Sequence, residues 1–149
     1  MRLPKDAKVS LLGKIPLFER CSKRQLARIA SIARETRYPP ATPVVRKGEQ
    51  GTDFFVVVEG EADVRSGARK LATLRPGSFF GEIALLTGSP RTATVTTGTP
   101  MRALVISSRA FRTLLQDSPD LQFKLLQEVG TRLEKLSSEQ AHQRIRLRH

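Results

Sequence analysis

The sequence predicts an α+β domain that is mainly β, with a β sandwich or roll between two helical ends. Three observations lead to this fold class. Both ends of the chain show helical spacing of apolar residues, the middle shows short apolar runs divided by glycine and proline, and 149 residues suffice for one domain with a full core. We therefore expect one domain over 1–149, with helices over 1–40, a β-roll over 41–107 and helices over 108–149.

The N-terminal part contains a helix start signal of high specificity. Ser22 and Gln25 form an S-x-x-Q capping box, in which two side chains satisfy backbone groups at the helix start. Apolar residues follow at helical spacing, and the helix is expected to end before Tyr38, because two prolines come next. A shorter helix over Val9–Phe18 is expected to precede it.

The middle of the chain has the pattern of an antiparallel β structure. Six short apolar runs stand at the spacing typical of strands in a sandwich or roll: Pro43–Val45, Asp53–Val58, Ala62–Val64, Lys70–Leu74, Thr92–Thr97 and Arg102–Ile106. Ser66-Gly67 predicts a hairpin turn. Phe79 and Phe80 alternate in a further strand, which places one in the core and the other at a pocket wall; we take Phe80 as the pocket residue.

The C-terminal part predicts two helices. Ser107-Ser108 can cap a short helix that carries Phe111. A longer helix is expected from Ser118-Pro119-Asp120, which supplies a cap, a first-turn proline and an acid at the positive end of the helix dipole. Its apolar residues form about two heptads of an ordinary packing seam: Leu126, Val129, Leu133 and Leu136.

The net charge of +12 is unevenly distributed. Residues 1–47 carry 12 basic and 3 acidic side chains, residues 48–108 carry 6 of each, and residues 109–149 carry 8 and 5. A solvated basic face is the favoured interpretation, because no aromatic residues interleave the charges as they do in a groove for single-stranded nucleic acid. A membrane surface or an RNA remains a remote alternative partner.

Composition excludes several other classes. No apolar run is long enough for a transmembrane helix, and charges interrupt the N-terminus too often for a signal peptide. The single Cys21 suits a reducing cytoplasm. Two histidines in the tail and one cysteine cannot assemble a metal site, and we expect neither a metal nor an enzyme. A small β-barrel enzyme of the cupin type would need strand histidines, and residues 43–106 contain none.

The segment 77–95, GSFFGEIALLTGSPRTATV, carries the chemistry. Free backbone N–H groups at the start of a helical turn form an anion site, and Gly81 permits a close approach of the backbone. Arg91 could pair with the same anion, whereas Glu82 beside a phosphate needs another group to accept from, such as a sugar hydroxyl. Taken singly, Arg91 could be a surface arginine and Glu82 an acid that complements a helix dipole.

This segment resembles a known motif. FGEIALLTGSPRTATV is similar to the phosphate-binding cassette of cyclic nucleotide-binding domains. The resemblance extends to KVSLLGKIPLFERCSKRQLARIA, to YPPATPVVRKGEQGTDFFVVVEGEADV and to ISSRAFRTLLQDSPDLQFKLLQ, which resemble the N-terminal helices, the first strands and the hinge and lid helices of that family. It implies a jelly-roll (double-stranded β-helix) with the cassette at 77–95.

The resemblance implies a role for each matching position. Arg91 would pair with the exocyclic phosphate, and Glu82 would accept from the ribose 2′-hydroxyl. The backbone amides that line the phosphate would be those of Gly81, Ile83, Ala84 and Thr92. Ala93 would leave room beside the ligand. The apolar strand residues that would face the sugar and base are Val64, Ala72 and Leu74. The lid helix would contact the base through Leu136 or Ser137.

The resemblance implies a regulatory module with cAMP as the expected ligand. Thr92 keeps cGMP open, because a hydroxyl at the position after the arginine can hydrogen-bond to guanine in this family. The expected partners are a cyclic nucleotide, an unknown effector protein and, through the C-terminal helix, a second copy of the chain. No DNA binding is expected, since the chain ends at His149; the alternative is the effector-binding half of a truncated transcription regulator.

Overall fold

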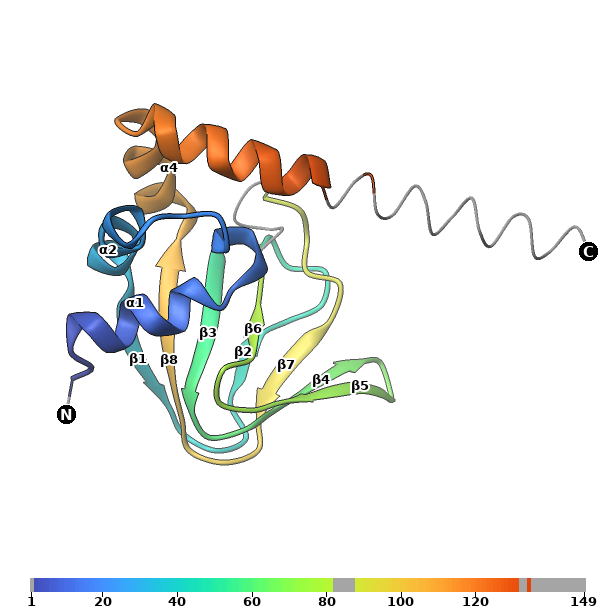
Figure 1. The fold of residues 1–149 in the computed structure, drawn as a ribbon. Helices are drawn as coiled ribbons and strands as arrows, with labels where there is room; N and C mark the ends of the chain where they lie inside the picture. Colours follow the sequence, from blue (N-terminus) through green and yellow to red (C-terminus); the bar gives the residue numbers. More distant parts are fainter. Residues whose placement is uncertain (1, 82–87, 132–133, 135–149) are drawn as a thin grey trace, which may run out of the picture.

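Two four-stranded antiparallel sheets form the body of the molecule. The computed structural model describes residues 2–81, 88–131 and 134. The strand orders are β1-β8-β3-β6 and β2-β7-β4-β5, and the sheets face each other as a roll (Figure 1). The strands are β1 (Arg34–Tyr38), β2 (Pro43–Val45), β3 (Asp53–Glu59), β4 (Ala62–Ser66), β5 (Arg69–Leu74), β6 (Phe79–Phe80), β7 (Thr94–Thr97) and β8 (Met101–Ser107). The predicted antiparallel roll between helical ends is confirmed.

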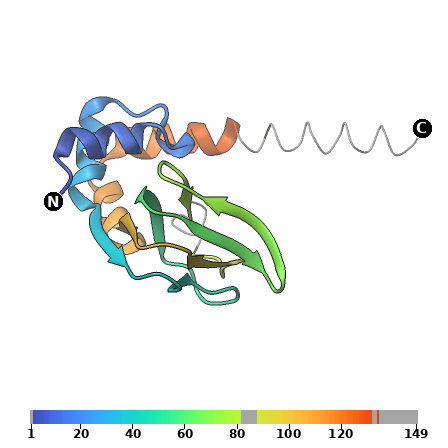
Figure 2. The same ribbon diagram turned by 90° about the horizontal axis from the view of Figure 1, so that it is seen from below.

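Helices gather on one side of the roll. Figure 2 shows the N-terminal helices and the C-terminal helix together as a layer beside the sheets. The helical elements are α1 (Lys5–Gly13), the 3₁₀ turn η1 (Pro16–Phe18), α2 (Lys23–Ile32), α4 (Ser108–Gln116) and residues 119–131. None of the helices in the described part of the chain is long and apolar enough to cross a membrane.

The predicted helix caps are present. Ser22 Oγ accepts from the Gln25 backbone N–H at 3.2 Å, and Gln25 Oε1 accepts from the Ser22 backbone N–H at 2.8 Å. At the start of α4, Ser107 Oγ accepts from the Ala110 backbone N–H at 3.1 Å. These bonds satisfy N–H groups that a helix start otherwise leaves unpaired.

The boundary between the first helical segment and the roll differs from the prediction. The sheets begin at Arg34, within the stretch 1–40 that the sequence predicts as helical. Strand β1 pairs with β8 from Arg34↔Val105 to Tyr38↔Met101. Its sequence, RETRY, carries almost no apolar pattern, so its strand conformation follows from pairing with the strongly apolar β8. The first helix also starts earlier than Val9, at Lys5.

The alternation of side chains along β3 divides the core into two clusters. Phe54 and Val56 point toward the helices, and Val57 points into the space between the sheets. On the helical side, the Phe18 ring lies edge-on to Phe54, with centroids 6.0 Å apart, and also 6.0 Å from Phe111 of α4. The larger cluster therefore joins both helical ends to one face of the first sheet.

The described part of the C-terminal helix, residues 119–131, is fixed to the N-terminal segment. Leu121 and Leu125 are buried in the larger cluster. Polar contacts reinforce this docking: Gln25 Nε2 donates to Asp120 Oδ2 at 2.7 Å, and Arg20 Nε lies 3.3 Å from Glu128 Oε2. These contacts hold the helix start against α2 and the turn before it.

The predicted apolar seam of this helix is not a single packed stripe. Val129 packs against the larger cluster, whereas Leu126 is 70% exposed. The residues that face the core recur every four positions, as Leu121, Leu125 and Val129, so the seam prediction is wrong for Leu126. The other two seam residues, Leu133 and Leu136, lie outside the described residues.

Candidate functional site

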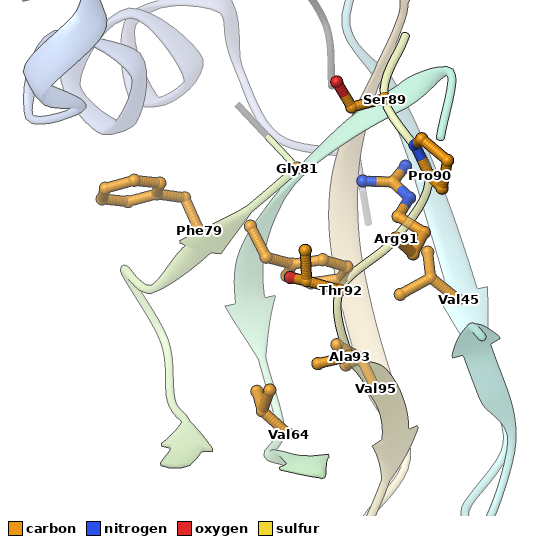
Figure 3. Close-up of a pocket in the computed structure, with 11 residues that line it drawn as sticks. Val45, Val64, Phe79, Gly81, Ser89, Pro90, Arg91, Thr92, Ala93 and Val95 are labelled. Carbon is orange, nitrogen blue, oxygen red and sulfur yellow. The ribbon is translucent and has the colours of Figure 1, made fainter. Parts of the chain in front are cut away.

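A cavity of about 360 Å³ lies between β6 of the first sheet and β2, β4 and β7 of the second. The loop that precedes β7 closes one side of it (Figure 3). The lining residues are Val45, Val64, Phe79, Phe80, Gly81, Ser89, Pro90, Arg91, Thr92, Ala93 and Val95. The cavity therefore brings together the end of β6, the 89–93 loop and the inner faces of three strands.

The loop that carries Arg91 is held by backbone bonds to the turn before β3. The Arg91 N–H donates to the Glu49 carbonyl at 2.8 Å, and the Arg91 carbonyl accepts from the Gly48 N–H at 2.8 Å. An isolated antiparallel bridge joins Gln50 to Pro90. Two backbone bonds on the same residue fix the position of the Arg91 Cα, so its side chain leaves the loop in a defined direction.

The Arg91 guanidinium is oriented by protein groups. Nη2 donates to the backbone carbonyl of Asp53 at 2.6 Å, and the guanidinium carbon lies 5.8 Å from the centre of the Phe55 ring. Phe55 in turn stacks on Phe80, with ring centroids 4.5 Å apart and planes 8° from parallel. Burial lowers the pKa of Arg91, and the Asp53 carboxylate opposes that shift. The side chain stays cationic at neutral pH, because the guanidinium is a very strong base.

Gly81 allows this arrangement by its lack of a side chain. Its φ is +87°, a conformation that favours glycine. A Cβ on this residue would lie 2.5 Å from Arg91 Nη1 and 2.6 Å from the Asp53 carbonyl oxygen. Figure 3 shows the guanidinium beside Gly81. The glycine that the sequence indicated for a close backbone approach therefore contacts the arginine itself.

The chemistry of the cavity is that of an anion site with apolar walls. Among the described residues that line it, Arg91 carries a charge, Ser89 and Thr92 have hydroxyl side chains, and most of the others are apolar. Such a cavity suits a ligand with one negative charge on an otherwise apolar or weakly polar body. No group of three or more histidine, cysteine, aspartate or glutamate residues is placed to hold a metal within the described ranges.

The structure brings most of the described candidate residues together. Those that line the cavity are Val64, Phe80, Gly81, Arg91, Thr92 and Ala93. Ala72 lies opposite Val64 in the β4–β5 pair, on the same sheet face but exposed. Leu74 lies opposite Ala62 and packs against the inner core cluster, and it is not among the described residues that line the cavity. The remaining candidates lie outside the described residues: Glu82, Ile83, Ala84, Leu136 and Ser137.

Sequence reasoning missed several groups at this site. Val45 and Val95 both line the cavity because they pair across β2 and β7. Each is readable as a strand residue, but their pairing is not readable from one sequence. The backbone carbonyl of Asp53, which accepts a hydrogen bond from Arg91, was not predicted either, since the type of a residue does not show what its backbone carbonyl binds. Phe79 lines the cavity as well as its neighbour, and its ring centroid lies 6.2 Å from that of Phe54 in the core.

Comparison with known proteins identifies a family. The family model described as the cyclic nucleotide-binding domain matches residues 35–118. The chain is 39% identical over 113 residues to a cAMP-dependent protein kinase regulatory subunit of Mycosarcoma maydis, a match that covers 70% of this chain and 22% of the relative. It is 36% identical over 111 residues to a cyclic nucleotide-gated potassium channel of Mesorhizobium japonicum, covering 74% of this chain and 31% of the channel.

A solved structure has the same fold over nearly its whole length. The N-terminal domain of a transcriptional regulator from Streptomyces coelicolor superimposes with a TM-score of 0.80 at 27% identity, covering 86% of this chain and 95% of that one. The chain thus spans less than a third of the length of each of the two curated relatives named above, and its match spans 95% of the solved chain.

Proposed function

Because the chain belongs to the cyclic nucleotide-binding domain family, we propose that it is a cyclic nucleotide sensor with cAMP as its ligand. The observation that carries this proposal is the Arg91 guanidinium, which stands as the charged group of a cavity with largely apolar walls. A cyclic phosphodiester bears a single negative charge, so one arginine can neutralise it. The sugar and base then supply the less polar surface that the strands can cover.

The arginine is prepared for this task before the ligand arrives. A guanidinium has five N–H donors in a rigid fork, and the bond to the Asp53 carbonyl uses one of them. The other donors of this fork can serve two phosphate oxygens, while the Phe55 ring limits how far the group can turn. An anion that binds here therefore avoids much of the cost of ordering a long side chain.

We assign the residues that contact the other parts of the ligand from the match to the family. The phosphate lies against Arg91 and the backbone amides of the cassette, and Glu82 accepts from the ribose hydroxyl. Apolar contacts to sugar and base come from Val64 and from the residues around it. The proposed binding set is Gly81, Glu82, Ile83, Ala84, Arg91, Thr92, Ala93, Val64, Ala72, Leu74 and Phe80, with Leu136 and Ser137 at the base.

The proposed output is regulatory rather than catalytic. Two relatives are by name a kinase regulatory subunit and a gated channel, and the solved neighbour is a domain of a transcriptional regulator. We propose that the ligand favours one arrangement of α4 and the C-terminal helix, and that a cytoplasmic effector protein reads this arrangement. A ligand achieves this only if it binds that arrangement more tightly than the other. Phe111 supports such coupling, because its ring joins α4 to Phe18 in the N-terminal segment.

A second candidate ligand is cGMP. Thr92 lines the cavity and directly follows the arginine, so its hydroxyl is available to a guanine amino group as well as to a phosphate. Comparing the affinities of cAMP and cGMP for this one cavity therefore decides between the two ligands.

Titration calorimetry with cAMP, cGMP and AMP tests the proposal. We expect cAMP to bind most tightly and AMP most weakly. Arg91→Ala should weaken cAMP binding by about thirty-fold to several thousand-fold, since removing one partner of a buried charge pair costs about 2–5 kcal/mol. Arg37→Ala, an exposed arginine on β1, is the matched control and should leave the affinity unchanged. Equal affinity for cAMP and AMP, or no effect of Arg91→Ala, would refute the proposed site.

A further inference from the structure

A second cavity lies away from the nucleotide site, between the end of α2 and the outer side of α4. It is an open groove of about 530 Å³. Its lining residues are Ile32, Ser107, Arg109, Ala110, Thr113, Leu114 and Asp117, none of which lines the nucleotide cavity. The groove therefore lies next to the hinge where the chain passes from β8 into α4, since Ser107 and Arg109 both line it. Figure 1 shows this junction beside α2.

The groove combines an apolar floor with a polar rim. On α4, Ala110 and Leu114 stand four residues apart and form one row, and Ile32 at the end of α2 meets them from the other side. A second row, also spaced by four, consists of Arg109 and Thr113 on α4 and of Asp117, the residue that caps its C-terminus. An apolar side chain of a partner can thus be buried on the floor while its polar neighbours meet the rim.

The two helices that form the groove are strongly basic. Together α2 and α4 carry Lys23, Arg24, Arg28, Arg109 and Arg112, and neither helix contains an acidic residue. Arg28 is occupied, because Nη1 donates to Ser118 Oγ at 3.2 Å. The Arg109 guanidinium makes no ion pair with any described residue.

The groove has a definite electrical polarity. Arg109 lies in the first turn of α4, where the helix dipole is also positive. Asp117 lies at the opposite end, at the C-terminus of the same helix, where both its charge and the dipole are negative. A negatively charged group is therefore attracted to the Arg109 end and repelled from the Asp117 end.

We propose that this groove docks an acidic amphipathic segment of a partner protein, with an apolar side chain on the floor and a carboxylate facing Arg109. The lining carries one basic residue, Arg109, and one acidic residue, Asp117, so the attraction for an acidic group is confined to the Arg109 end. The apolar floor favours a peptide over a nucleic acid, since no aromatic residue lines the groove to stack on a base. The proposal does not depend on which nucleotide binds, because the two cavities share no residue.

A designed peptide tests this docking site. The probe is a fluorescein-labelled helical peptide of about 15 residues, with leucine every three or four positions and glutamate at most others. We expect saturable binding by fluorescence anisotropy. We expect none for the same peptide with serine in place of leucine, and none with lysine in place of glutamate. Binding of the serine peptide as tightly as the leucine peptide would overturn the role of the apolar floor.

Two arginines on the same helix provide a matched pair of variants. Arg109→Glu should weaken binding of the acidic peptide by about tenfold, because it removes an attraction at the groove and adds a repulsion there. Arg112→Glu makes the same charge change at an exposed position outside the lining and should have less than about a third of that effect. Asp117→Asn should bind the peptide slightly more tightly. Cyclic nucleotide affinity serves as the control for folding in all three variants.

Several results would overturn the proposal. Equal losses in Arg109→Glu and Arg112→Glu would mean diffuse charge attraction and no defined groove. A weaker affinity in Asp117→Asn would contradict the polarity. Binding of RNA or anionic vesicles that displaces the peptide and depends on Arg109 would assign the face to those partners. A concentration-dependent dimer in ultracentrifugation that Arg109→Glu dissociates would assign the groove to a second copy of the chain.

Discussion

Replacing Gly81 with alanine is expected to destabilise the fold and to displace Arg91 at the proposed nucleotide site. The backbone of Gly81 has φ +87°, and an added Cβ would lie 2.5 Å from Arg91 Nη1 and 2.6 Å from the Asp53 carbonyl oxygen. The arginine end can swing aside at little cost. The Asp53 carbonyl cannot, because it belongs to the first residue of β3, which pairs with β8.

The size of the effect follows from two contributions. The positive φ costs an alanine about 1–2 kcal/mol. Overpacking against the Asp53 backbone adds about 1–3 kcal/mol. Gly81→Ala should therefore destabilise the protein by about 2–5 kcal/mol in total. Gly77→Ala is the matched control: its φ is +92°, but nothing lies within 4 Å of an added Cβ, so only the first cost applies.

Urea unfolding followed by circular dichroism measures this difference. We expect Gly81→Ala to lose more free energy of unfolding than Gly77→Ala by about 1–3 kcal/mol. Calorimetry with cAMP at low temperature, where both variants are folded, should show weakened binding for Gly81→Ala alone. If both variants lost the same stability, or if Gly81→Ala bound cAMP as tightly as the unchanged protein, the close approach would not matter and the reasoning would be wrong.

Three further changes test other parts of the molecule. Ser22→Ala removes the acceptor of the capping box and should lower the free energy of unfolding by about 1 kcal/mol in urea titrations; no change would show that α2 does not depend on its cap. The hydrogen bond from Gln25 is the largest cause that holds the pKa of Asp120 below its ordinary value of 3.8. This carboxylate therefore stabilises the fold above that pH and loses its contribution as the pH falls through the lowered pKa, so Asp120→Asn should flatten the acid limb of a stability profile. Gly130 lies inside the last helix with open space around it, and Gly130→Ala should raise stability by about 0.5–1 kcal/mol, measured by thermal unfolding; a decrease would mean that the glycine has a packing role.

Local signals in the sequence predicted much of the fold. The capping box at Ser22 and the cap at Ser107 lie where the sequence placed them, because each depends on residues within one helical turn. The apolar run at Asp53 became a central strand, because it is buried on both faces. The turn at Gly67 joins β4 to β5 with φ +61°, as a hairpin requires.

Features that depend on long-range pairing could not be read in this way. Strand β1 is polar, and its partner lies in β8, at the other end of the roll. The face of a helix that is buried also depends on what packs against it. Leu126 has the same side chain as Leu125, yet the N-terminal segment covers only Leu125.

At the site, the side chain of Arg91 was predictable and its orientation was not. Its motif indicated the residue type that an anion needs. The Asp53 carbonyl that holds it and the Val45–Val95 pair that lines the cavity depend on which strands are neighbours. A single sequence carries no record of such neighbours.

The polar bonds between the two ends of the chain have a mechanical consequence. Lys124 Nζ donates to the Arg20 carbonyl at 2.7 Å, close to the Gln25–Asp120 and Arg20–Glu128 contacts. A pulling force on this helix would strain these contacts directly, because they join residues 120–128 to residues 20–25. The same helix also buries Leu121 and Leu125 in the cluster that contains Phe54 of β3, so its displacement would disturb the packing of the first sheet.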